Sequence, residues 1–457
     1  MELTMLEEEI EHIAEKAKKY GLDYFPVRFE ICPADIIYTF GAYAMPTRFS
    51  HWSFGKAFYR MKTQYDFNLS RIYELVINSD PCYAFLLEGN SLLQNKLVAA
   101  HVFAHCDFFK HNATFRRTSR GMVESMAVSA DRVRELEFKH GVKEVERIID
   151  AALAIQYHID PRPDIGQVSE ANKAKLRLET PYDDLFALDA PPEEAEIEEK
   201  TAAEQDLLRF IMQNSRNLKD WQREILAVIH AEMLYFSPQL ETKIMNEGWA
   251  SYWHDRIMRE LDLTADESVE FAVMHSSVVA PSQLGLNPYY LGFKIWEDIE
   301  RRWDNPQAKD RENLRLSGGE GRQKMFEVRE AENDLSFVRN YLTNDLIREL
   351  DLFVFEKSGR DWIITEKDCD KVRNKLVVQL VNSGHPYIVV ADGDYKGNGE
   401  LLLQHCHEGV DLDVPYLERT LAHVHTLWGR TVHLRTEMDG KPVIYSQNGE
   451  RAEMTNG

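Results

Sequence analysis

Two histidines one helical turn apart are the first residues in this sequence whose types and spacing could do chemistry. His101 and His105 lie in the segment SLLQNKLVAAHVFAHCDFF, which opens with an S-x-x-Q capping box formed by Ser91 and Gln94. The capping box predicts a helix, and residues four apart lie on one face of a helix, so both imidazoles could bind one metal ion. Apolar residues share that face, and the pair could equally be core histidines hydrogen-bonded to neighbours.

A glutamate farther along the chain offers a third ligand. Glu247 lies in MNEGWASYWH, within a long helical stretch. This segment resembles the N-E-G-(F/W)-A sequence that carries the glutamate ligand of gluzincin metallopeptidases, where two helical histidines and that glutamate hold zinc. The alternative is an exposed helix charge, but the residues on its face are Ile244, Ser251 and Met258, and a carboxylate among them needs a cation or a hydrogen-bond partner. The sequence therefore predicts a divalent metal, zinc above all, held by His101, His105 and Glu247.

The general base of the zincin pattern H-E-x-x-H is missing. Val102 stands where the glutamate that activates the attacking water would be. A hydrolase would need another carboxylate, and the candidates are Glu124 and Asp131 on one helix and Asp107 just after the second histidine. Each could instead be a surface or salt-bridging acid. Glu124, Asp107 or His254 could also enlarge the ligand shell to suit iron or manganese.

Two further groups of residues could support the chemistry. His254 follows Glu247 by two helical turns on the same side, so it could orient a ligand, act as an acid, or only pack. The segment PTRFSHWSFGK combines Arg48, His51 and Lys56 with aromatic residues, a mixture that suits an acidic or amide-rich substrate. Aromatic loop packing with incidental cations is the alternative.

Composition narrows the class of protein. The 457 residues are 44% hydrophobic and 28% charged, as in ordinary globular proteins of two or three domains. Lys and Arg total 54 against 76 Asp and Glu, a formal charge of −22, which repels nucleic acid and anionic lipid.

The sequence has no recognisable targeting signal and no paired cysteines, as expected of a protein in a reducing compartment. The N-terminus has no basic region followed by an apolar one, and no run of about 18 apolar residues occurs, so neither secretion nor membrane insertion is expected. The five cysteines are scattered and form no C-x-x-C pair, which predicts neither disulfides nor a cysteine zinc site. We expect a cytoplasmic protein.

The hydrophobic pattern changes along the chain and predicts its organisation. Residues 24–59 are rich in aromatics, Pro and Gly, as in ordered loops, and helical periodicity dominates residues 60–158. Residues 160–205 carry five prolines and many charges, which predicts a flexible insertion or linker. After further helices, the last hundred residues have the order ββα, ββα, ββ.

These patterns predict three regions. Residues 1–159 and 206–345 form a mainly α-helical, metallopeptidase-like (zincin-like) N-terminal domain that carries the metal site. Residues 160–205 are the insertion, and residues 350–457 form a small α+β C-terminal domain whose role is regulation or binding.

Five blocks of the sequence resemble the stage V sporulation protein R family. They are EICPADIIYTFGAYAMPTRFSHWSFGK, ELVINSDPCYAFLLEGNSLLQNKLVAAHVFAHCDFFKHN, YFSPQLETKIMNEGWASYWH, NPYYLGFKIWEDIE and HTLWGRTVHL. The resemblance covers almost the whole chain, with 160–205 the least similar part. It implies a cytoplasmic protein needed for the spore cortex, and association with a serine-kinase-like AAA ATPase and a von Willebrand factor A-type protein.

Two functions are compatible with these residues. In one, the protein is a metal-dependent hydrolase or amide-bond enzyme whose C-terminal domain regulates it. In the other, it is a non-catalytic regulatory or scaffold protein of sporulation with a structural metal site.

Overall fold

A computed structural model describes most of the chain and divides it into two compact units. The described residues are 3–67, 74–162, 204–281, 285–308, 311, 317–358 and 361–456. Most of the predicted insertion, residues 163–203, lies outside them. Unit 1 comprises Met1–Glu146 and Tyr235–His385, and unit 2 comprises Arg147–Leu234 and Pro386–Gly457. Within the described residues, no helix is both long and apolar enough to cross a membrane.

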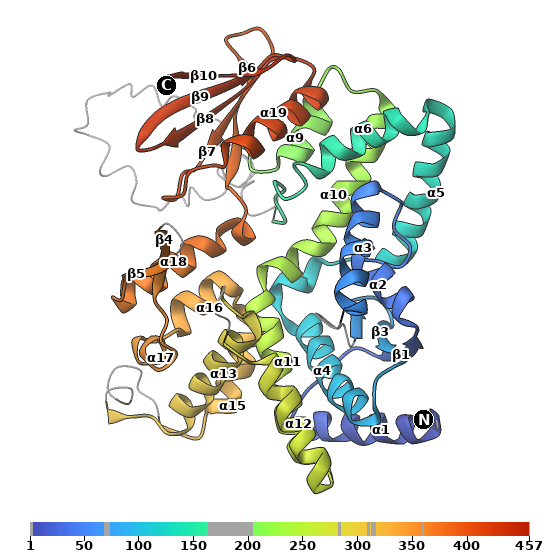
Figure 1. The fold of residues 1–457 in the computed structure, drawn as a ribbon, viewed down its shortest axis with the longest axis vertical. Helices are drawn as coiled ribbons and strands as arrows, with labels where there is room; N and C mark the ends of the chain where they lie inside the picture. The colour runs from blue at the N-terminus through green and yellow to red at the C-terminus, as the bar shows by residue number, and fades with distance from the viewer. Residues whose placement is uncertain are drawn as a thin grey trace, which may run out of the picture. The chain divides into compact units, whose positions relative to one another are not determined.

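Unit 1 is mainly helical (Figure 1). Its helices are α1 (Leu3–Lys19), α2 (Ala34–Tyr43), α3 (Trp52–Asp66), α4 (Leu92–His111), α5 (Met122–His140), α11 (Lys243–Arg259), α12 (Ala265–Val278), α13 (Pro288–Asp304), α15 (Gly321–Ala331), α16 (Asp334–Tyr341), α17 (Asn344–Glu349) and α18 (Cys369–Leu380). A short 3-10 helix, Ala113–Arg117, follows α4.

A small sheet lies where the sequence predicted loops and helices. β1 (Val27–Cys32), β2 (Glu74–Ile77) and β3 (Cys82–Leu87) form a sheet of order β1-β3-β2, with β3 parallel to β1 and antiparallel to β2. The predictions of loops over 24–59 and helices over 60–158 were wrong here. The reason is that β3, CYAFLL, is an apolar run buried along almost its whole length, and such a run lacks the alternation that marks a half-buried strand.

Three helices form the centre of unit 1. α4, α11 and α13 pack side by side (Figure 1). Their core contains three tryptophans, Trp249, Trp253 and Trp296, all at most 1% exposed, with ring centroids of Trp249 lying 5.4 Å from Trp253 and 5.0 Å from Trp296. Burial of such large apolar surfaces supplies most of the packing free energy, so α11 is held on two sides.

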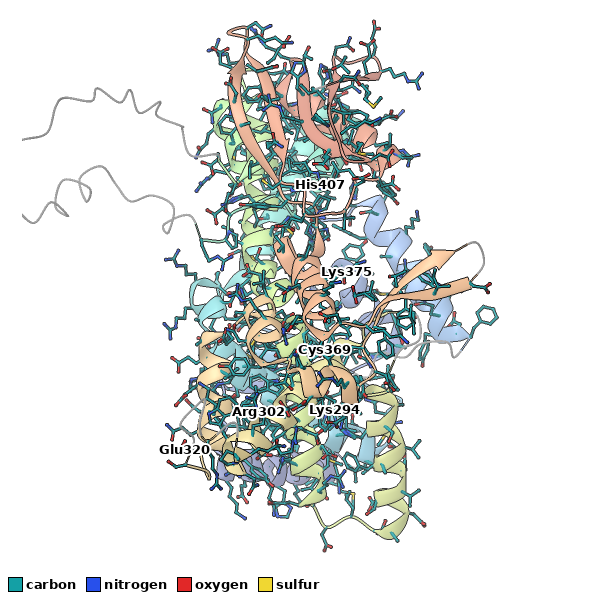
Figure 2. The ribbon with its side chains drawn as sticks, turned by 90° about the vertical axis from the view of Figure 1, so that its left-hand side faces the viewer. Lys294, Arg302, Glu320, Cys369, Lys375 and His407 are labelled. Carbon is teal, nitrogen blue, oxygen red and sulfur yellow. The ribbon has the colours of Figure 1, made fainter. Side chains whose placement is uncertain are left out.

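The division between the units differs from the boundary expected near residue 350. β4 (Val354–Ser358) and β5 (Asp361–Glu366) form an antiparallel pair, and α18 follows them with Cys369 at its start and Lys375 farther along (Figure 2). α18 packs against α16 and α17, so this first ββα segment belongs to unit 1. Its strand and helix types agree with the sequence pattern, but it does not pair with the strands that come later.

Unit 2 contains the larger sheet. Its order is β10-β9-β8-β7-β6, built from β6 (Ile388–Tyr395), β7 (Glu400–His405), β8 (Val432–Met438), β9 (Lys441–Gln447) and β10 (Ala452–Asn456). β7 and β8 are parallel and the other pairs antiparallel, because α19 (Val414–Trp428) provides the crossover between them and packs on β8 and β9. α9 (Leu207–Asn214) packs against β6, while α6 (Val142–Leu153) and α10 (Asp220–Glu241) each span a division between the units. The predicted class, a helical N-terminal part followed by an α+β C-terminal part, is confirmed.

Candidate metal centre

The predicted capping box starts the helix that carries the two histidines. The hydroxyl of Ser91 accepts the backbone N–H of Gln94 at 3.1 Å, and the Gln94 side chain accepts the backbone N–H of Ser91 at 2.9 Å. From this start, α4 runs buried between α1 and α11, so nearly every side chain in its middle is covered. His101 and His105 are 4% and 8% exposed.

Glu247 on α11 meets both histidines. Its Oε2 lies 3.8 Å from Nε2 of His101 and 3.5 Å from Nε2 of His105. The three residues can each offer one ligand atom such that all three atoms lie within 4.8 Å of one another. Ligands of a tetrahedral zinc at 2.0–2.1 Å are separated by about 3.4 Å, so small side-chain movements would bring these atoms to coordinating distance.

The far sides of both imidazoles are anchored by hydrogen bonds. Nδ1 of His105 lies 2.8 Å from Oδ1 of Asn246, and Nδ1 of His101 lies 2.9 Å from Nδ1 of His254. A side-chain amide oxygen can only accept, so Nδ1 of His105 donates, and Nε2 keeps its lone pair. Ligating histidines in metalloproteins are oriented in this way, which makes the pair fit a metal ion.

The protonation states at the site also suit a cation. Burial, together with the neighbouring His101, lowers the pKa of His105 to about 4. Burial raises the pKa of Glu247, but His101, His105 and a hydrogen bond from Tyr289 outweigh it and lower that pKa below its usual value. Neutral imidazoles and an ionised carboxylate are the forms that bind divalent metals.

The backbone around Glu247 is fixed from two directions. The carboxylate of Asp334 accepts the N–H groups of Ile244 at 2.7 Å and Met245 at 2.8 Å, which satisfies two donors at the start of α11. On the other side, α13 crosses so closely that a Cβ added to Gly248 would lie 2.3 Å from the carbonyl carbon of Gly292. Only glycine fits at this crossing, which explains why Gly248 follows the candidate ligand Glu247.

The three acids considered as a general base lie elsewhere. Asp107 is fully buried and accepts Nη1 of Arg329 at 2.7 Å and Nε1 of Trp249 at 3.0 Å, so it is occupied in a structural ion pair. Glu124 and Asp131 are exposed on α5, where Asp131 pairs with Arg134 at 2.9 Å. The structure does not bring these residues into the cluster of three ligands.

The structure places His254 beside the cluster, and the cationic segment makes contacts among its own residues. His254 is fully buried against His101, which places it beside a candidate ligand. Arg48 lies over the ring of Phe54 at 4.3 Å, and His51 caps α3, where its Nδ1 lies 2.7 Å from the hydroxyl of Ser53. Lys56 is exposed on the same helix.

Three residues beside the ligands were not identified as site residues from the sequence. Asn246 holds His105, Tyr289 binds Glu247, and His275 binds His254, with Nδ1 of His275 2.9 Å from Nε2 of His254. Asn246 and Tyr289 belong to the sequence blocks MNEGWASYWH and NPYYLGFKIWEDIE, and that was the only signal available for them. Nothing in the local sequence of His275 indicates its partner.

Comparison with known proteins gives a boundary between residues 385 and 386, which is also the last boundary between the two units. A family model described as SpoVR like protein matches residues 1–385, and one described as SpoVR-like C-terminal domain matches residues 386–439. The uncharacterized protein YcgB of Escherichia coli (strain K12) is 32% identical over 458 residues, which cover 92% of this chain and 89% of that protein. No solved structure matches. The chain therefore belongs to the SpoVR family of sporulation-related proteins.

Proposed function

We propose that this protein is a cytoplasmic, zinc-dependent hydrolase or amide-bond enzyme of the zincin-like type that acts in spore cortex formation. The observation that carries the proposal is the convergence of His101, His105 and Glu247 from two helices, with their ligand atoms within 4.8 Å of one another. Gluzincin metallopeptidases use this ligand set in the same chain order.

The residues of the chain would divide the work as follows. His101, His105 and Glu247 would hold the zinc ion, which would supply a Lewis acid at this site. Asn246 and His254 keep the imidazoles oriented, and Tyr289, hydrogen-bonded to Glu247, orients the third ligand. The proton acceptor would have to come from the substrate or from a group outside this cluster, because Val102 replaces the zincin glutamate.

A structural metal site in a regulatory or scaffold protein is the second candidate. The missing glutamate favours it, as does the ion pair that Asp107, the acid just after the second histidine, forms with Arg329. A cytoplasmic address fits either candidate, and it would make the substrate of an enzyme a soluble precursor or a protein. The AAA ATPase and the von Willebrand factor A-type protein are the partners that we propose to test by co-purification.

The first experiment is the metal content of protein purified without chelator. We expect close to one zinc per chain in the wild type and loss of zinc in His105→Ala and Glu247→Ala. His405→Ala is the matched control, because His405 is also a buried histidine, in unit 2, bonded to Thr436 at 2.8 Å. Metal-free wild-type protein, or zinc retained by both ligand variants, would contradict the proposed site.

A second experiment separates the enzyme from the scaffold. Cobalt(II) substituted for zinc has an absorption spectrum that reports coordination number, and a small hydroxamate binds only a metal with an exchangeable position. A hydroxamate-induced change in the cobalt spectrum would support the enzyme. An unchanged spectrum would mean a closed shell and would favour the structural role.

A further inference from the structure

Three buried histidines form a continuous hydrogen-bonded chain that starts at a candidate ligand. Nδ1 of His101 lies 2.9 Å from Nδ1 of His254, and Nε2 of His254 lies 2.9 Å from Nδ1 of His275. Nε2 of His275 lies 3.7 Å from Oδ1 of Asp255, where the chain ends. The three histidines are 4%, 0% and 9% exposed, and they come from α4, α11 and α12.

The chemistry of neutral imidazole determines which nitrogen donates in each of these hydrogen bonds. Each neutral ring has one N–H and one lone pair, so the tautomer of one histidine determines the tautomer of the next. If Nε2 of His101 binds metal, its proton is on Nδ1 and is donated to His254. His254 then carries its proton on Nε2 and donates it to His275, whose own proton points toward the Asp255 carboxylate.

The opposite set of hydrogen-bond donors is disfavoured at the His275–Asp255 contact. It would place the lone pair of His275 Nε2 against the Asp255 carboxylate, whose Oδ1 is buried and has no hydrogen-bond partner among the described residues. Two acceptors facing each other in a buried site are destabilising. The other oxygen of Asp255 accepts Nε of Arg259 at 2.8 Å, so Oδ1 is the oxygen available to the imidazole.

We infer that His254 and His275, terminated by Asp255, are positioning residues that fix His101 as the tautomer with its proton on Nδ1, and so present Nε2 to the metal. This inference rests on the proposed metal site. In many metal sites a carboxylate accepts a hydrogen bond directly from the ligating histidine. Here two further histidines would lie between the Asp255 carboxylate and His101, and they would transmit the orienting effect of the anion.

Zinc affinity tests the inference through a pair of substitutions at one position. Glutamine at position 254 can accept from His101 and donate to His275, whereas leucine can do neither. We expect His254→Leu to lower zinc affinity about 10- to 100-fold, and His254→Gln to restore most of it. His405→Leu, the matched loss of a buried histidine elsewhere, should leave the affinity unchanged. Equal affinities of the leucine and glutamine variants would show that only packing matters and would overturn the inference.

A spectroscopic test needs no metal and separates this inference from the proposed function. Nitrogen-15 chemical shifts of labelled histidine distinguish a protonated ring nitrogen from an unprotonated one. In the metal-free protein, the carboxylates of Glu247 and Asp255 compete for the proton direction, because Glu247 lies 3.8 Å from Nε2 of His101 and Asp255 lies 3.7 Å from Nε2 of His275. Asp255→Asn removes one of these anions without touching His101, so it should shift the tautomer equilibrium of His101 toward a proton on Nε2. Nitrogen-15 shifts of His101 that Asp255→Asn leaves unchanged would overturn the positioning role of His254, His275 and Asp255, even if zinc binds. Absence of zinc binding with the expected shifts would overturn the metal proposal alone.

Discussion

The contact between α11 and α13 at Gly248 makes a sharp prediction about stability. A methyl group at this position would lie 2.3 Å from the carbonyl carbon of Gly292, 2.4 Å from its Cα and 2.7 Å from the backbone nitrogen of Phe293. Carbon atoms in contact are about 3.5–4.0 Å apart. The helices would therefore have to separate by about 1.2 Å, because backbone atoms cannot turn away as a side chain can.

The size of the effect follows from two opposing contributions. Overpacking in a core costs about 1–3 kcal/mol, and more where nothing can rotate. Replacing glycine by alanine inside a helix gains about 1 kcal/mol through backbone entropy. We expect Gly248→Ala to lower the free energy of unfolding by about 2 kcal/mol. It should also weaken zinc binding, since Glu247 is the adjacent residue.

Urea denaturation followed by circular dichroism measures this change, and the chain offers a matched control. Gly55 also lies inside a helix, α3, but an added Cβ there would have nothing within 4 Å. Gly55→Ala should be neutral or stabilise by up to about 1 kcal/mol. If Gly248→Ala were as stable as Gly55→Ala, the close crossing of the two helices would not exist as described.

Three further predictions concern charge and metal. Zinc at one hundred times its dissociation constant should stabilise the wild type by about 2.7 kcal/mol, seen as a higher melting temperature, and should not stabilise Glu247→Gln. The metal-free protein should lose stability as the pH falls from about 6.5 toward 4, because His105 binds a proton in the unfolded state but stays neutral when it is buried in the folded state. The free energy of unfolding should fall by about 3 kcal/mol over this range. Urea unfolding of His105→Asn should show a weaker dependence of the free energy of unfolding on pH. Asp107→Ala should cost about 3–5 kcal/mol by leaving Arg329 buried without its anion, and the double variant Asp107→Ala/Arg329→Met should recover part of the loss in the same assay.

Local sequence patterns predicted the three candidate ligands and the start of the helix that holds two of them. The capping box at Ser91 predicted where α4 begins, and the spacing of His101 and His105 predicted that they share a face. The N-E-G-W segment singled out Glu247, which the structure brings to both histidines. In the last hundred residues, strand-like runs and turn residues predicted β4 to β9, α18 and α19, whereas β10 was not predicted.

The remaining features depend on contacts between distant segments, which spacing does not encode. β1 and β3 pair in parallel although α2, α3 and β2 lie between them in the chain. The partner of His254 is His275 on the next helix, and only the packing of α12 against α4 and α11 brings it there. The first ββα segment has the same local pattern as the second, so the pattern could not tell that α18 packs on α16 and α17.

The two units alternate along the chain, so neither can be completed early in synthesis. Unit 1 begins at the N-terminus but ends at residue 385, and unit 2 begins at residue 147 but ends at the C-terminus. A ribosome therefore releases α4, with its histidines and apolar surface, long before α11 exists to cover it. Unit 1 cannot be complete until translation has reached residue 385, and the surface of α4 that α11 covers stays exposed until α11 is made. Apolar surface exposed in this way is prone to aggregation.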